Sequence, residues 1–190
     1  MPDLSADRNS ILEQLKQAED AAERLLTGKS REQANWQPNQ GTSWSMWQCF
    51  DHLARINRVY CQALLAAVEN PRVTRESTPQ MVKPGLFSRW FIKGMEPPVR
   101  IRFKALAKVT PSEGGDPQGA LQAFLESHAP VRRVLDFWDR VNFDRARFKN
   151  PFVPLLRFTV GTGLMVINAH DRRHLWQAER LPDAPGFPKV

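Results

Sequence analysis

The sequence predicts an all-α protein, a four-helix bundle with a long crossover connection between the second and third helices. Apolar residues recur at spacings of three and four in four long stretches, which is typical of helices that bury one face. No stretch alternates convincingly between apolar and polar residues, as a half-buried strand would. With 190 residues, 42% of them hydrophobic, the chain is long enough to bury a substantial core. We therefore expect a single domain over residues 1–190.

The first two helices are predicted from their apolar stripes and their capping residues. One is expected over about Ser10–Thr27, where Ser10 and Glu13 have the spacing of a capping box. The next is expected over about Ser45–Glu69, and its first residue has the same spacing from Gln48. Both stretches carry a local start signal as well as an apolar face.

The third and fourth helices follow the crossover connection. Asp116 is expected to cap the third helix, with Pro117 in the first turn, where a missing N–H costs nothing. The apolar stripe continues to Trp138, although Pro130 is expected to bend or break the helix. The fourth helix is expected over about Phe158–Arg180. The long connection lets the second and third helices, which flank it, run parallel to each other, which a short loop would not.

Positive charge is concentrated in this connection, where short helices are expected over about Leu86–Met95 and Val99–Lys108. The net charge of the chain is +7, and residues 81–108 contain one acid, Glu96, and seven basic residues: Lys83, Arg89, Lys93, Arg100, Arg102, Lys104 and Lys108. Such a segment could attract an anionic substrate, a nucleic acid or a membrane face. A solvated basic connector is the preferred interpretation, because regularly interleaved aromatic residues and known nucleic-acid motifs are missing.

Histidines in two of the predicted helices form a candidate metal site. His170 and His174 are four residues apart, so they project from one helix face and can converge on one ion. His52, in the second helix, would be the third ligand. Three imidazoles leave coordination positions for water or substrate, as in reactive metal sites. On spacing alone, His128 competes as third ligand, and Cys49, close to His52 on the helical wheel, could be a soft extra ligand.

Other polar and aromatic residues near these histidines have less specific predictions. Gln177 lies one turn beyond His174 and is a candidate catalytic residue that could hydrogen-bond a metal-bound water or the substrate. Trp44 and Trp47 are expected to pack at the start of the second helix rather than bind a ligand. Asp51 points about 100° away from His52 on a helical wheel, so it is not expected to orient that imidazole.

The cysteines and the termini bear on the cellular compartment. Cys49 and Cys61 are too far apart on one predicted helix to form a disulfide, which suits a reducing cytoplasm. The N-terminal residues lack the apolar segment of a signal peptide. The most apolar stretch, Phe152–Ala169, is interrupted by proline, arginine and glycine. We therefore expect a cytoplasmic protein with no membrane partner.

Several short motifs occur in an order that resembles the DinB/YfiT-like superfamily. They are NWQP before the second helix, Trp44-Ser45 at its start, Asp51-His52-Leu53 one to two turns later, and HxxxH followed by Gln177 in the last helix. The resemblance covers most of the chain except the crossover connection. It implies a four-helix bundle with a divalent metal, usually zinc or nickel, held by His52, His170 and His174. It also assigns His128 to packing or to the surface.

The resemblance implies two classes of function. Similar proteins include thiol-dependent S-transferases and isomerases, and proteins classed as metal-dependent hydrolases. We therefore expect a metal-dependent enzyme that activates water or a low-molecular-weight thiol against a small-molecule substrate, and it could form a homodimer. The alternative is a non-catalytic stress-response or binding module that engages nucleic acid or another acidic partner through its basic segment. Nucleic acid is the less expected partner.

Overall fold

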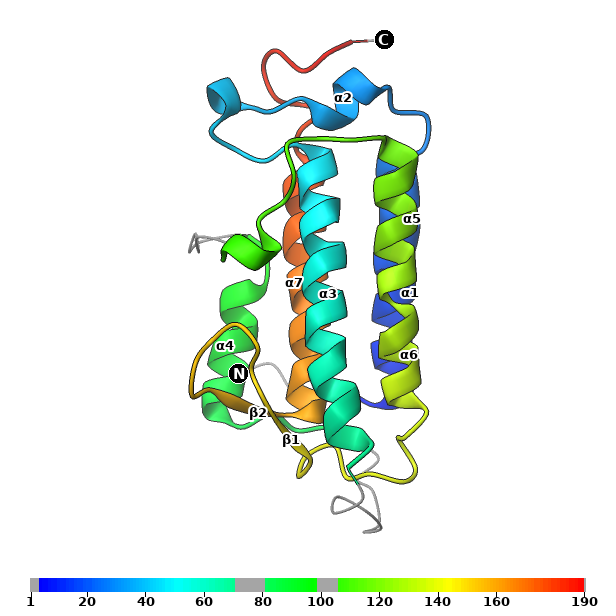
Figure 1. The fold of residues 1–190 in the computed structure, drawn as a ribbon, viewed down its shortest axis with the longest axis vertical. Coiled ribbons are helices and arrows are strands. Elements are labelled where there is room, and N and C mark those ends of the chain that lie inside the picture. Colours follow the sequence, from blue (N-terminus) through cyan, green and yellow to red (C-terminus); the bar gives the residue numbers. More distant parts are fainter. Residues whose placement is uncertain (1–3, 71–80, 99–105, 190) are drawn as a thin grey trace.

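A computed structural model describes residues 4–70, 81–98 and 106–189 of the chain. In the described residues, long helical columns run side by side along the longest axis of the molecule (Figure 1). These columns are α1 (Arg8–Leu26), α3 (Met46–Val68), α5 with α6 (Pro117–Ser127 and Ala129–Leu135), and α7 (Val160–Glu179). The predicted all-α bundle is therefore confirmed. No helix within the described ranges is long and apolar enough to cross a membrane.

Two of the predicted helix starts are capped as expected, and one is not. Ser45 and Gln48 form a capping box at the start of α3, and Asp116 accepts a hydrogen bond from Gly119 N before α5. The box expected from Ser10 and Glu13 is wrong. Asp7 accepts a hydrogen bond from Ser10 N at 2.7 Å, and Asp7 N donates to Ser10 Oγ at 3.0 Å. A carboxylate one turn earlier is the stronger cap for the exposed N–H groups, so α1 begins at Arg8.

The third helical column is broken, as Pro130 predicts. The break lies at His128, which ends α5 and precedes α6, and the proline lies in the first turn of α6. There its missing N–H removes no helical hydrogen bond. The two segments stay nearly in line, so they form one column of the bundle (Figure 1).

A small antiparallel sheet precedes the last helix, contrary to the sequence pattern. Strands β1 (Arg147–Lys149) and β2 (Arg157–Thr159) pair with Phe148 opposite Phe158. The sequence pattern predicts a helix that begins at about Phe158, but α7 begins at Val160 with Thr159 as its cap. Strands of three residues are too short to show a readable alternation, which explains why the sequence pattern missed them.

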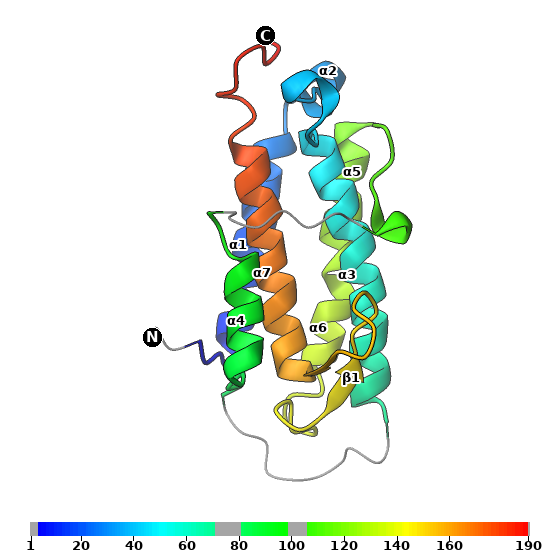
Figure 2. The same cartoon turned by 90° about the vertical axis from the view of Figure 1, so that its left-hand side faces the viewer.

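The crossover connection contains the predicted short helix α4 (Leu86–Met95), which lies along α7 (Figures 1 and 2). Arg172 of α7 binds the carboxylate of Glu96, with Nε 3.0 Å from Oε2. Of the helix expected over Val99–Lys108, residues 99–105 lie outside the described ranges, and only a 3-10 turn, η3 (Ala107–Val109), is described. Two further short elements precede α3: α2 (Arg31–Asn35) and the 3-10 turn η1 (Asn39–Gly41).

Close packing of α7 against α3 brings the two histidine-bearing helices together. A Cβ added to Gly163 would lie 2.7 Å from Leu64 Cδ2 and 2.8 Å from Phe148 Cε1, so a larger residue would push these elements apart. Cys49 and Cys61 are both buried and unpaired, as their spacing predicts.

Candidate metal site

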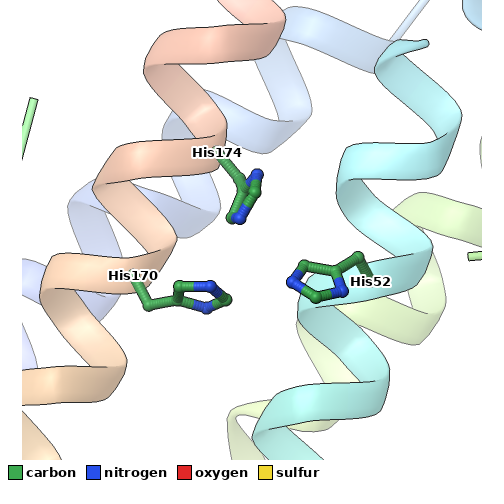
Figure 3. A group of neighbouring side chains, drawn as sticks. All are labelled: His52, His170 and His174. Atoms are coloured by element: carbon green, nitrogen blue, oxygen red, sulfur yellow. The ribbon is translucent and has the colours of Figure 1, made fainter. Parts of the chain in front are cut away.

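Three imidazoles meet between α3 and α7. His52 comes from α3, His170 and His174 come from α7, and Figure 3 shows their rings pointing toward one another. One nitrogen from each ring lies within 4.8 Å of the others. The ring centroids are separated by 4.7 Å for His170 and His174, and by 4.9 and 5.3 Å from His52 to His174 and His170. The three residues singled out in the sequence therefore lie close enough to hold one metal ion.

Hydrogen bonds fix the tautomers of two of these rings. His52 Nδ1 lies 2.7 Å from the carbonyl oxygen of Val109. Because a carbonyl can only accept, Nδ1 carries the proton and Nε2 keeps its lone pair. His174 Nδ1 lies 3.2 Å from Gln177 Oε1 and donates to it in the same way. Each of these rings therefore presents an Nε2 lone pair of the kind that metals bind.

His170 differs from the other two rings. Its Nδ1 atom is buried and has no hydrogen-bond partner within the described part of the chain. A buried polar atom without a partner is costly, and such atoms are concentrated at functional sites. A ring with this unsatisfied nitrogen fits a place in a metal-ligand set.

Burial keeps all three imidazoles neutral at physiological pH. It lowers the pKa of His52, against the opposing effect of the hydrogen bond to Val109. Burial, with smaller contributions from His52 and Arg173, lowers the pKa of His170 to about 3. The pKa of His174 is likewise lowered well below its usual value, first by burial and then by His170. Neutral imidazole is the form that binds metal, so no proton has to leave before an ion is bound.

The other candidate ligands lie away from this cluster. His128 is completely buried, with Nδ1 2.9 Å from Glu19 Oε1 and Nε2 3.1 Å from Asp171 Oδ2. Burial lowers the pKa of His128, but its bonds to Asp171 and Glu19 outweigh this effect and raise the pKa to about 9. A histidinium held by two carboxylates is a packing group, which agrees with the role implied by the resemblance. Cys49 is buried, burial raises the pKa of its thiol, and it is not in the histidine cluster.

Trp44, which the sequence predicts to pack at the start of the second helix, packs against the histidine cluster. Its ring centroid lies 4.7 Å from that of His52 and 5.5 Å from that of His174, so it covers two of the three imidazoles. Trp47 packs as expected, and its Nε1 donates to the carbonyl of Asp116. Trp44 and Trp47 are three positions apart at the start of α3, so the sequence does not distinguish them. Their different contacts depend on how α3 packs against α7.

Two charged neighbours of the cluster have different roles. Asp51 accepts from Arg55 Nε and from Ser112 N, each at 2.9 Å, and is not hydrogen-bonded to His52, as its angle on the wheel predicts. Arg173 is buried and donates to the carbonyl of Gly94 at 3.1 Å. Its charge contributes to the lowered pKa values of His170 and His174, so it lies near enough to add positive potential to the site.

Residues 14–178 match the family model of the DinB superfamily. No curated protein and no solved structure matches the chain significantly.

Proposed function

Because the chain belongs to the DinB superfamily, we propose that it is a metal-dependent enzyme whose ion is held by His52, His170 and His174. The observation that carries this proposal is the cluster of three neutral imidazoles with ligand nitrogens within 4.8 Å of one another. Zinc or nickel is the proposed ion, because both accept imidazole ligands.

The chemistry would be activation of a nucleophile. His52, His170 and His174 would hold the ion as neutral ligands, and the ion would supply a lowered pKa to a water molecule or thiol bound at the site. The proposed reaction is therefore hydrolysis of a small molecule or transfer of a low-molecular-weight thiol to it. Within the part of the chain that the structure describes, the metal-ligand group contains no carboxylate. Arg173 adds a further positive charge, so an anionic nucleophile or substrate would be favoured electrostatically.

Two other residues contact the imidazoles of the proposed metal site. The indole of Trp44 covers His52 and His174 and would limit the access of water from that side. Gln177 accepts the Nδ1 proton of His174, which supports a role in positioning that ring, beside the candidate catalytic role that its place in the sequence suggests.

Metal analysis of purified protein tests the proposal directly. We expect one zinc or nickel ion per chain, lost in His52→Ala and in His174→Ala because either change removes a ligand. His128→Ala is the control, since His128 is bonded to Glu19 and Asp171 instead, and it should keep its ion. Loss of metal in the His128 variant alone would refute the assignment. Thiol-transfer and hydrolase assays with and without chelator would then identify the reaction.

A second candidate function rests on the basic connector. The charge of residues 81–108 would suit a non-catalytic module that binds nucleic acid or another acidic partner. Three of its basic residues, Arg100, Arg102 and Lys104, lie outside the described ranges. If duplex DNA is the partner, affinity should fall steeply and log-linearly with salt and be lost when these three residues are neutralised. If they only steer an anionic substrate, the same triple variant should show a raised, salt-dependent KM and unchanged metal content.

A further inference from the structure

The exposed large hydrophobic residues of the described chain gather in three segments. They lie in or beside α4, beside η3, and in the loop between β1 and β2: Met81, Leu86, Phe87, Trp90, Leu106, Val153 and Leu155. Leu86 is 82% exposed, Trp90 is 64% exposed, and Leu155 is completely exposed. Isolated exposed apolar residues are common on proteins, but a group restricted to one region marks an interaction surface.

Contacts join these segments into one face. Phe87 and Phe91 of α4 pack on Phe158 of β2, with ring centroids 6.3 and 5.1 Å apart. Lys108 of η3 donates to the carbonyl of Pro151 in the loop at 2.9 Å. In Figure 1, α4 and the loop lie on the left-hand side of the bundle, whereas α1 and α5 lie on the right. Figure 2, seen from that left-hand side, shows α4 and the loop on either side of α7. We call these segments, residues 81–98, 106–109 and 147–157, the apolar-basic face.

This face is also strongly positive. Its only acid, Glu96, is bound by Arg172. Its basic residues are all exposed except the half-buried Arg89: Lys83, Arg89, Lys93, Lys108, Arg147, Lys149 and Arg157. On α4 itself, Leu86, Trp90 and Lys93 follow one another at helical spacings of four and three, so tryptophan, leucine and lysine share one stripe.

We propose that the apolar-basic face docks the protein on an anionic lipid surface. Exposed Trp, Phe and Leu beside Lys and Arg are the combination that enters the headgroup region of a bilayer. A flat bilayer can accept the α4 stripe and the separate loop tip together. The sequence predicts no membrane partner because it has no spanning segment, but docking on a bilayer surface does not need one.

Charge and chemistry argue against the other occupants. A second copy of this chain would bring its own basic residues against the lysines and arginines of this face, so like-charge repulsion opposes that pairing. Nucleic acid would bind the basic residues, but it would not explain the aliphatic side chains of Leu86, Val153 and Leu155, because these neither stack on bases nor bind phosphate.

Co-sedimentation of the full-length protein with vesicles tests the proposal. The protein should bind vesicles of phosphatidylcholine with phosphatidylserine, more weakly as salt rises, and bind phosphatidylcholine alone much less. Leu86→Ser/Trp90→Ser should weaken binding by about tenfold or more, because it removes the apolar contact. Lys83→Gln/Lys93→Gln should weaken it by about 30-fold, from a loss of about 1 kcal/mol for each lysine. Metal content should stay unchanged in both variants.

Lys16→Gln/Arg24→Gln on α1 is the matched control, since it removes the same charge from the other side of the bundle. Its binding should stay within about twofold of the parent, because distant charges are screened by salt. The proposal is overturned if the control loses as much binding as Lys83→Gln/Lys93→Gln. It is also overturned if the parent protein binds vesicles with and without phosphatidylserine equally. It is also overturned by dimers that depend on Leu86 and Trp90, which would indicate a second copy. Binding to polyglutamate that needs these two residues would instead indicate an acidic protein partner.

Discussion

At the scale of single residues, the partners of His52 and His174 determine how well the cluster is prepared for an ion. Val109 supplies a backbone carbonyl to one ring and Gln177 supplies an amide oxygen to the other. Both oxygens accept the Nδ1 proton, so both rings are held as the tautomer with a free Nε2. Loss of such a partner typically lowers metal affinity or activity by about 10- to 100-fold.

Replacement of Gln177 tests this role. Gln177→Leu should weaken zinc binding by about tenfold or more, because the His174 ring loses the acceptor that orients it. At saturating zinc the variant should still bind one ion per chain. Affinity can be measured by competition with a chromophoric chelator. Gln177→Glu keeps an acceptor at the same place and should bind at least as tightly as the parent, whereas equal affinity of the leucine variant would rule out the positioning role.

The lowered pKa values of the three ligands predict the pH dependence of metal binding. Free histidine has a pKa of about 6.5, and below its pKa the proton competes with the metal. Burial lowers the pKa of each of the three rings, that of His170 to about 3. Protonation therefore begins at lower pH than in free histidine, and zinc affinity should be nearly unchanged between about pH 7.5 and 6.5 and fall only below that range. A steep loss that already starts near pH 7 would show that the rings are not protected by burial.

At the scale of elements, α7 combines two kinds of contact. Its two histidines face His52, and Gly163, two turns earlier, allows α3 and β1 to approach closely. The junction of α5 and α6 adds a third connection, because His128 is bonded both to Glu19 on α1 and to Asp171 on α7. These contacts explain why α7 is buried along most of its length.

Gly163 provides a test of this close packing. Gly163→Ala should destabilise the protein by about 1–3 kcal/mol, because the new methyl group would overlap Leu64 and Phe148. The helix propensity of alanine, better by about 1 kcal/mol, acts in the opposite direction. Urea denaturation measures the difference. Gly94→Ala on α4 is the control, because its Cβ would meet nothing within 4 Å, and it should be neutral or stabilising by up to about 1 kcal/mol.

At the scale of the whole molecule, the bundle has two large apolar clusters that do not depend on an ion. One joins the β1–β2 hairpin to the lower parts of α3 and α7, and the other joins α1, α3 and α5 near α2 (Figure 1). Both consist of buried hydrophobic residues from several elements. We therefore expect that a bound metal is needed for the chemistry of the site and that the bundle folds without it.

Removal of the metal should accordingly have a limited effect on folding. When the free metal concentration is about 1,000 times the dissociation constant, binding adds about 4 kcal/mol to the free energy of unfolding. Removal of the metal should therefore lower Tm by about 10 °C for a protein of this size. The helical circular dichroism signal at 25 °C should remain after chelation. Complete loss of that signal would identify the ion as a structural requirement, as in small zinc fingers.

Much of the fold could be predicted because helices are local. The apolar periodicity of α1, α3, α5 and α7 depends on residues three and four positions apart, as does the capping box of Ser45 and Gln48. The spacing of four residues, which is also local, places His170 and His174 on one face of their helix. Where two local signals competed, the prediction was wrong: the carboxylate of Asp7 replaced Ser10 as the cap of α1. The short strands around Phe148 and Phe158 gave no readable pattern.

The choice of the third histidine depended on contacts between distant segments. Spacing left His128 and Cys49 open, the family resemblance favoured His52, and the tertiary structure places His52 beside His170 while His128 is bonded to Asp171. The approach of Trp44 to the imidazoles and the carbonyl from Val109 likewise depend on how α3, α7 and the crossover connection pack. Local sequence thus determines which residues share a helix face, whereas the state of each imidazole is decided by burial, which only the packed helices create.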